Sequence, residues 1–192
     1  MKLEQFVRRS YGESNGQERD ELFCKPGEES NPVSIITSVS STGKHFTISE
    51  EAKNAKECYR FIWHDGKCVG RIELMQLDEK SQPSVNGPFS RIPPRIAHQQ
   101  IFRILHCFIV LGLRRQGFMI AAYKAIIREL SSKGQVLASR PFCRNKYSRG
   151  LWKYLATDPL IKVVRRNTDA GMLDYALILK DDLGIALGIP SQ

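Results

Sequence analysis

Two arginines, a glutamine and a glycine, Arg114 to Gly117, separate two strongly apolar stretches of the chain. The preceding stretch, 102–110, has the composition of a buried strand, and the following one, 117–132, has the apolar periodicity of a helix. The first N–H groups of a helix have no partner inside it, and the helix dipole is positive at that end. A strand that enters a helix through a turn of this composition is therefore predicted to bind phosphate.

The positive charge of the chain lies in its second half. The net charge is +9, and residues 1–96 hold 14 Lys and Arg against 14 Asp and Glu, whereas residues 97–192 hold 15 against 6. Between Glu129 and Asp158 the chain has cations and no acid. Such a field attracts polyanions, which favours nucleic acid, an acidic protein or a phosphorylated cofactor as partner. A solvated basic surface without any partner is the alternative.

Length and composition predict one α/β domain, because 192 residues with 42% hydrophobic content can form one ordinary core. We divide it into an N-terminal segment, 1–46, with the first strand at 33–39 and loops, and a core, 47–192. The five cysteines are scattered without CxxC spacing, which argues against disulfides and against a metal site. No apolar run reaches the roughly 18 residues of a membrane span, and we expect no membrane partner and a cytoplasmic location.

The remaining elements are predicted from alternation and turn residues. A hairpin over 58–77 turns at Asp65-Gly66 and places Tyr59, Phe61 and Trp63 on one face. Short helices are expected at 2–9 and at 50–56, the latter capped by Ser49. The stretch 78–100 is expected to be a long loop, either a lid or substrate wall or a disordered excursion. Strands at 136–139, 161–164 and 173–179 and a helix at 148–155 complete the chain.

This order of elements resembles the GNAT superfamily of acetyl-CoA-dependent N-acyltransferases over roughly residues 33–180. Its strongest motif is the turn, where GNAT proteins carry Gln/Arg-x-x-Gly-x-Gly/Ala: here Arg114 and Gly117 match, and Met119 replaces the small residue. The stretch 139–155 is also similar to GNAT variants found in phage genomes. The resemblance implies an α/β fold with a mixed, mostly antiparallel central sheet flanked by helices.

The resemblance implies that the ligand is acetyl-CoA or another acyl-CoA. Main-chain N–H groups of the turn would hold its pyrophosphate, and a cation such as Arg115, Lys146 or Arg149 its 3′-phosphate. The pantetheine arm would pair with the central strand, whose main chain at Cys107 and Ile109 would polarise the thioester carbonyl. The thiol of Cys107 is expected to be an inert core group. The implied cofactor-binding residues are Cys107, Ile109, Arg114, Arg115, Gln116, Gly117, Phe118, Met119, Lys146 and Arg149.

The sequence identifies the general acid and the general base of the acyl transfer less clearly than the cofactor site. GNAT proteins place a tyrosine near the start of the second conserved helix to protonate the leaving thiolate; here Trp152 stands in that slot, and Tyr147 and Tyr154 flank it. For the base, His106 is one candidate, although a histidine in the core is the preferred interpretation. Two further candidates, Glu73 on the hairpin and His98 in the long loop, stay open.

These features predict an enzyme that transfers an acetyl or similar group from coenzyme A to an unidentified amine. One alternative is a nucleic-acid-modifying protein like the phage Mom proteins of the same superfamily. In that case Ser139 and Tyr147 would contact the nucleobase that is modified. Another is a catalytically inactive GNAT-shaped protein that binds an acidic partner through its basic half. Coenzyme A binding separates the last alternative from the other two.

Overall fold

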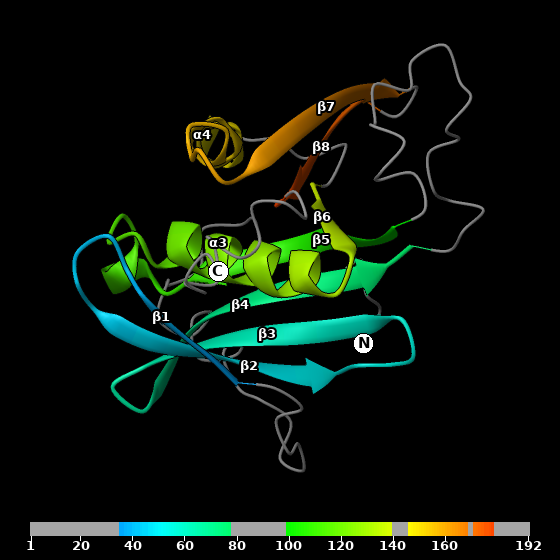
Figure 1. Cartoon of the computed structure of the whole chain (residues 1–192). Helices are drawn as coiled ribbons and strands as arrows, with labels where there is room; N and C mark the ends of the chain where they lie inside the picture. The colour runs from blue at the N-terminus through cyan, green and yellow to red at the C-terminus, as the bar shows by residue number, and fades with distance from the viewer. Residues whose placement is uncertain (1–34, 78–98, 140–145, 169–170, 179–192) are drawn as a thin grey trace, which may run out of the picture.

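The strands of the protein form one eight-stranded sheet in the order β1-β2-β3-β4-β5-β6-β8-β7. The computed structural model describes residues 35–77, 99–139, 146–168 and 171–178 (Figure 1). The elements are β1 (Ile35–Val39), β2 (His45–Ala52), β3 (Glu57–His64), β4 (Lys67–Gln76), β5 (Gln100–Ile109), the 3-10 turn η2 (Leu111–Leu113), α3 (Phe118–Ser132), β6 (Gln135–Ala138), α4 (Lys146–Leu155), β7 (Lys162–Thr168) and β8 (Gly171–Leu177).

Strands β1 to β5 are antiparallel neighbours in chain order. The predicted hairpin is confirmed: β3 pairs with β4, and the turn residues Asp65 and Gly66 have φ values of 49° and 72°, as a tight turn with two left-handed residues requires. The helix expected at 50–56 is wrong, because residues 45–52 form β2 and pair with both β1 and β3. The division of the chain at residue 46 falls inside this strand.

A register shift interrupts the pairing of β4 with β5. Glu73 lies opposite His106, whereas the next residue of β4, Leu74, lies opposite Ile104, so that Leu105 is the extra residue of a bulge. Bulges bend a strand and increase its local twist, and they occur often beside functional sites. The strand therefore changes direction in the middle of the sheet.

The two halves of the sheet meet at one short parallel pair. Helix α3 connects β5 to β6, which pair only over 100–103 and 135–138. Beyond β6, β8 is antiparallel to β6 and to β7. In Figure 1 strands β1–β4 lie below, β7, β8 and α4 lie above, and β5, β6 and α3 lie between them. From Ile104 onward β5 runs without a partner in β6.

Helix α3 covers one face of the sheet and supplies much of the core. Its residues Phe118, Ala122, Ile126 and Leu130 are almost fully buried, at the spacing of one helical face. Helix α4 packs beside it, since Trp152 and Leu155 belong to the same cluster and the rings of Trp152 and Tyr123 lie 6.2 Å apart, edge to face. In the described part of the chain, no helix is long and apolar enough to cross a membrane.

A buried arginine joins α3 to the sheet. Arg60 of β3 is 2% exposed, and its guanidinium pairs with Glu50 of β2 and, at 3.0 Å, with Glu129 of α3. Removing one member of such a group leaves a buried charge without compensation, which is costly. The ion pairs therefore fix the position of α3, and with it the turn that precedes the helix.

Candidate acyl-CoA site

In the described part of the chain, no strand pairs with the main chain of β5 on one side at Cys107 and Ile109. The N–H of Val110 donates to Val69 of β4 at 2.9 Å, and Phe108 O lies near Gly70 of the same strand. Because successive residues of a strand direct their N–H and C=O groups to opposite sides, Cys107 and Ile109 direct theirs away from β4. On that side β6 has already diverged. These are the two positions predicted from the sequence.

Arg114 binds this open edge itself. Its Nε donates to the carbonyl of Ile109 at 2.9 Å, and its guanidinium lies 5.4 Å from the centre of the Phe108 ring. The Ile109 carbonyl is thereby satisfied, which leaves the N–H of the same residue for another acceptor. Arg114 therefore connects the end of β5 to the turn through contacts within the protein.

The turn before α3 contains two residues in the left-handed region. Arg115 has a φ of 64°, and Gly117, the N-cap of α3, has a φ of 81° and no side-chain cap. The first turn of the helix holds no acid. Successive N–H groups in such a turn converge on one point, and they join the positive end of the helix there. Arg115 is exposed beside them.

The side chains after the glycine point into the protein. Phe118 is 1% exposed and packs against Phe46, with ring centres 5.6 Å apart. Met119 is half-buried and packs against the main core. The larger residue that replaces a small one at position 119 is therefore accommodated by the core. At Phe118 only the main chain remains to contact a ligand in the turn.

The β1–β2 turn lies directly against this element. A β-carbon built on Gly117 would be 1.9 Å from Ser41 Oγ, and Thr42 Oγ1 donates to the carbonyl of Gln116 at 3.1 Å. Sequence reasoning missed both hydroxyl residues. The only signal in the sequence is their place in a Ser- and Gly-containing turn, and nothing there indicates contact with a segment about 75 residues away.

The thiol of Cys107 contacts the hydroxyl of Tyr123 on α3. Solvent reaches the side chain, yet surrounding protein raises the pKa of the thiol by desolvation, and the hydrogen bond with the Tyr123 hydroxyl only partly opposes this. Burial likewise raises the pKa of Tyr123 well above its ordinary value. Both groups are therefore protonated at neutral pH, and a thiol is a poor nucleophile. The expectation that Cys107 is a core residue is wrong, because its side chain is exposed.

His106 lies on the face of the sheet away from α3. Its neighbour Cys107 contacts Tyr123 of α3, and side chains alternate between the faces of a strand. The side chain of His106 is exposed, which corrects the interpretation as a core histidine. Across the ladder it faces Glu73, the other base candidate that the structure describes. The third candidate, His98, lies outside the described residues.

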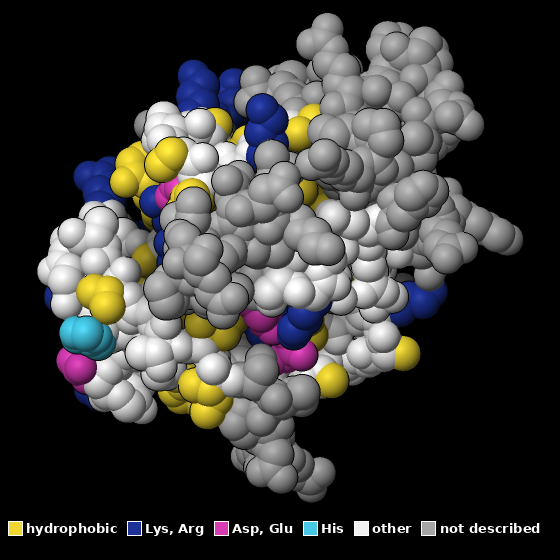
Figure 2. All heavy atoms as spheres, in the orientation of Figure 1, with side chains coloured by type: hydrophobic (Ala, Val, Ile, Leu, Met, Phe, Trp, Pro, Cys, Tyr) yellow, Lys and Arg dark blue, Asp and Glu magenta, His cyan; other side chains and the backbone are white. Residues whose placement is uncertain are grey.

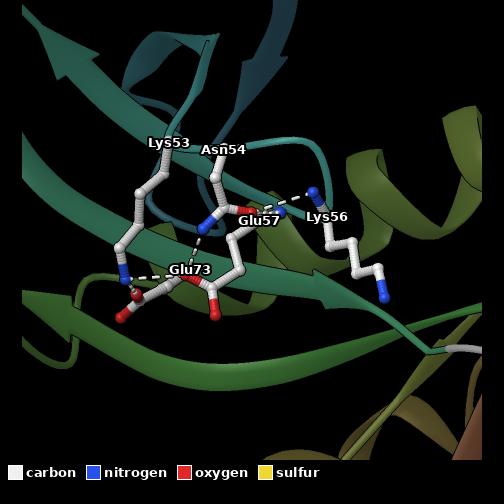
Figure 3. A network of polar contacts seen from close by, with 5 residues as sticks. All are labelled: Lys53, Asn54, Lys56, Glu57 and Glu73. Carbon is white, nitrogen blue, oxygen red and sulfur yellow. Dashed lines mark hydrogen bonds and ion pairs between the residues drawn. The ribbon is translucent and has the colours of Figure 1, made fainter.

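Glu73 belongs to a network of polar contacts (Figure 3). The carboxylate is largely buried, and Lys53 Nζ lies 2.6 Å from its Oε1 and 2.8 Å from Oε2 of Glu57. Burial lowers the pKa of Lys53, but the hydrogen bonds with Glu57 and Glu73 outweigh this and raise it above its ordinary value. Lys53 therefore stays charged and holds the Glu73 carboxylate in place. The ion pair thus fixes this carboxylate opposite His106 in the ladder.

The remaining candidates lie on or near α4. Arg149 is exposed, and Tyr154 is exposed with Lys124 Nζ 5.4 Å from its ring centre. Ser139 follows β6 and is 2% exposed. Lys146 and Tyr147 form the first turn of the helix. Thus the structure brings together the open edge, the turn and the pair His106 and Glu73, and it places Tyr154 on the outer surface.

Comparisons with solved structures show a similarity in fold. No family model matches the sequence, and no curated protein matches it. Among solved structures, an uncharacterized protein from Bacillus halodurans has a TM-score of 0.50 at 10% identity, covering 83% of this chain and 100% of that one. RimJ from Mycobacterium smegmatis, in complex with CoA-disulfide, has a TM-score of 0.47 at 9% identity, covering 82% and 95%.

The N-acetyltransferase YlbP from Bacillus subtilis, in complex with coenzyme A, has a TM-score of 0.40 at 18% identity, covering 63% of this chain and 67% of that one. At such identities a similarity concerns the fold alone. The predicted α/β class with a mixed, mostly antiparallel sheet is confirmed. Within the described ranges, no three His, Cys, Asp or Glu side chains form a group that could hold a metal ion.

Proposed function

We propose that this protein is an acyl-CoA-dependent N-acyltransferase. One observation carries the proposal: at Cys107 and Ile109, directly before the turn that begins α3, β5 no longer pairs with β6. The pantetheine arm of coenzyme A contains amide groups that can pair with an open strand edge, in the way an added strand would. Its phosphates fit the converging N–H groups of the turn. The two parts of the ligand thus match two adjoining parts of the site.

Different residues would bind different parts of coenzyme A. The N–H groups from Arg115 to Met119 would hold the pyrophosphate, with the exposed guanidinium of Arg115 beside it. Arg114 would act as a positioning residue, because its side chain is bound to the Ile109 carbonyl. Lys146 and Arg149 on α4 are our candidates for the 3′-phosphate. Acyl-CoA supplies the acyl group as an activated thioester.

The amine would reach the opening from the face that carries His106. A neutral imidazole there would accept the proton of the attacking amine, while Glu73, held by Lys53, faces it across the ladder. The main-chain N–H of Cys107 on the open edge would stabilise the oxygen of the carbonyl under attack. Tyr147 in the first turn of α4 is our candidate for returning a proton to the thiolate, because Tyr154 lies on the outer surface.

The experiment that tests this function measures thiol release from acetyl-CoA in the presence of a panel of primary amines, including peptides, polyamines and amino sugars. The proposal predicts thiol release that requires one class of amine and gives an equal amount of acetylated product. Binding of acetyl-CoA without transfer to any amine would favour the inactive binding protein instead. Absence of acetyl-CoA binding would contradict the proposal.

A further inference from the structure

The outer surface of α4 is a basic surface formed by Arg149, Lys153 and Lys162. Arg149 and Lys153 are one helical turn apart on α4, and Lys162 opens β7; all three are exposed. Figure 2 shows Lys and Arg side chains gathered over α4 and the adjoining end of β7. We call these three residues the α4 basic surface.

Among the described residues, no acid forms an ion pair with the cations of this surface. Helix α4, KYSRGLWKYL, contains no acidic residue. The next acid in the chain, Asp158, is bound by Lys124 at 2.6 Å and by the N–H of Leu160 at 3.1 Å. Within the described part of the chain, no ion pair involves Arg149, Lys153 or Lys162. An uncompensated group of exposed cations of this kind attracts a polyanion.

An exposed aromatic residue, Tyr154, directly follows Lys153 in α4. Tyr154 is 48% exposed, although large apolar side chains of helices are normally turned toward the core, and Lys124 Nζ lies 5.4 Å from its ring centre. An aromatic ring among cations can stack on a base while the cations contact phosphates. An acidic peptide would use the cations and leave the ring without a role. The combination therefore favours nucleic acid over an acidic protein.

From this arrangement we propose that the α4 basic surface and Tyr154 bind single-stranded nucleic acid. The phosphates contact Lys153, Lys162 and Arg149, and one base stacks on Tyr154. Single strands suit the surface better than a duplex, because only an unpaired base offers its face to a side chain. Arg149 is also a candidate for the 3′-phosphate of coenzyme A, whereas Lys153, Lys162 and Tyr154 have no part in the proposed acyl transfer, so the test relies on these three residues.

The test uses the full chain and a fluorescein-labelled oligothymidylate of about 20 nucleotides, with affinity measured by anisotropy over a series of salt concentrations. The expected result is binding that weakens steadily with salt, by roughly 0.7 log units per decade for each phosphate contact. At about 0.1 M salt, losing one such contact lowers affinity about fivefold, so Lys153→Glu and Lys162→Glu should each lower it at least about fivefold.

Two comparisons make the result specific. Lys67→Glu, at the exposed β3–β4 turn, changes the net charge equally and should leave affinity within about twofold. Tyr154→Ala should lower affinity about fivefold or more, whereas Tyr154→Phe retains the ring and the affinity. Equal losses in Lys67→Glu and Lys153→Glu would overturn the proposal. So would displacement of the oligonucleotide by a polyglutamate peptide of equal charge at equal concentration, which would identify an acidic protein as the partner.

Discussion

Ser41 occupies the space that a side chain at Gly117 would need. A β-carbon on Gly117 would lie 1.9 Å from Ser41 Oγ and 2.8 Å from Ser41 N, well inside any normal contact. The β1–β2 turn is thus packed against the start of α3, with a hydrogen bond from Thr42 to Gln116 beside it. Position 117 is glycine for two independent reasons, a left-handed φ and this close contact.

The first prediction concerns Gly117→Ala. Strain in the left-handed region and the clash with Ser41 should together lower the free energy of unfolding by about 2 kcal/mol or more. Urea denaturation followed by circular dichroism measures this. The double variant with Ser41→Gly should recover part of the loss, because it removes Oγ and Cβ but leaves the Ser41 nitrogen. A loss below about 0.5 kcal/mol would contradict the packing described.

Arg115→Gly should weaken acetyl-CoA binding without lowering the stability of the protein. Glycine relieves the left-handed strain at a φ of 64°, so the free energy of unfolding should stay unchanged or rise by up to about 1 kcal/mol, despite the greater entropy of the unfolded chain. The affinity for acetyl-CoA should fall roughly fivefold, because an exposed cation next to a phosphate contributes about 1 kcal/mol. An unchanged affinity would remove Arg115 from the site.

Asp158 should make the protein sensitive to acid. Burial alone would raise the pKa of Asp158, but the hydrogen bonds from Lys124 and Leu160 N–H outweigh it and hold the pKa below its usual range. A lowered pKa in the folded state contributes stability at pH values above the unfolded pKa, near 3.9, and this contribution is lost as the pH falls through the folded pKa.

The comparison that tests this is Asp158→Asn against wild type in urea denaturation at pH 7 and near pH 3. The variant should be less stable at pH 7, and the difference should become smaller as the pH falls below about 4. Lys124→Ala should show the same convergence, because the hydrogen bond from Lys124 is the main contact that lowers the pKa. A difference that stays constant with pH would mean that Asp158 acts only through packing.

His106→Ala should reduce kcat/KM for acetyl transfer at least about 100-fold while leaving acetyl-CoA affinity unchanged, because a general base acts only in the reaction step. Because the His106 side chain is exposed, the substitution should not reduce the stability of the fold. Glu73→Gln tests positioning: it should shift the acidic limb of the pH profile of kcat/KM and reduce the rate less than His106→Ala does. Equal affinity and equal rate in His106→Ala would exclude this histidine as the base.

Turn residues and hydrophobic periodicity were sufficient to predict most of the elements of the fold. The hairpin at Asp65-Gly66, the strand before Arg114 and the helix after Gly117 are each specified by turn residues and periodicity, and all three are present. The segment 50–56 was mispredicted because Ser49 with two following acids is typical of a helix start, whereas pairing with both β1 and β3 makes it a strand. Contacts distant in sequence override local preference there.

The site was harder to predict from the sequence, because it also depends on contacts between residues that are distant in sequence. The resemblance to GNAT proteins was enough to choose Cys107 and Ile109, because their positions are counted along one strand back from Arg114. The exposure of His106 depends on the bulge at Leu105 and on which elements cover each face of the sheet. The contacts of Ser41 with Gly117 and of Tyr123 with Cys107 join separate segments, and no single stretch of sequence encodes them.

The most direct test of the central claim is calorimetric titration of the protein with acetyl-CoA, alongside Arg115→Glu and the charge-matched control Lys67→Glu. The account predicts binding in the micromolar range to the wild type and to Lys67→Glu, and an affinity at least about tenfold lower in Arg115→Glu, because an acid replaces a cation beside the phosphates. The account would be contradicted if the wild type did not bind acetyl-CoA, or if all three proteins bound it equally.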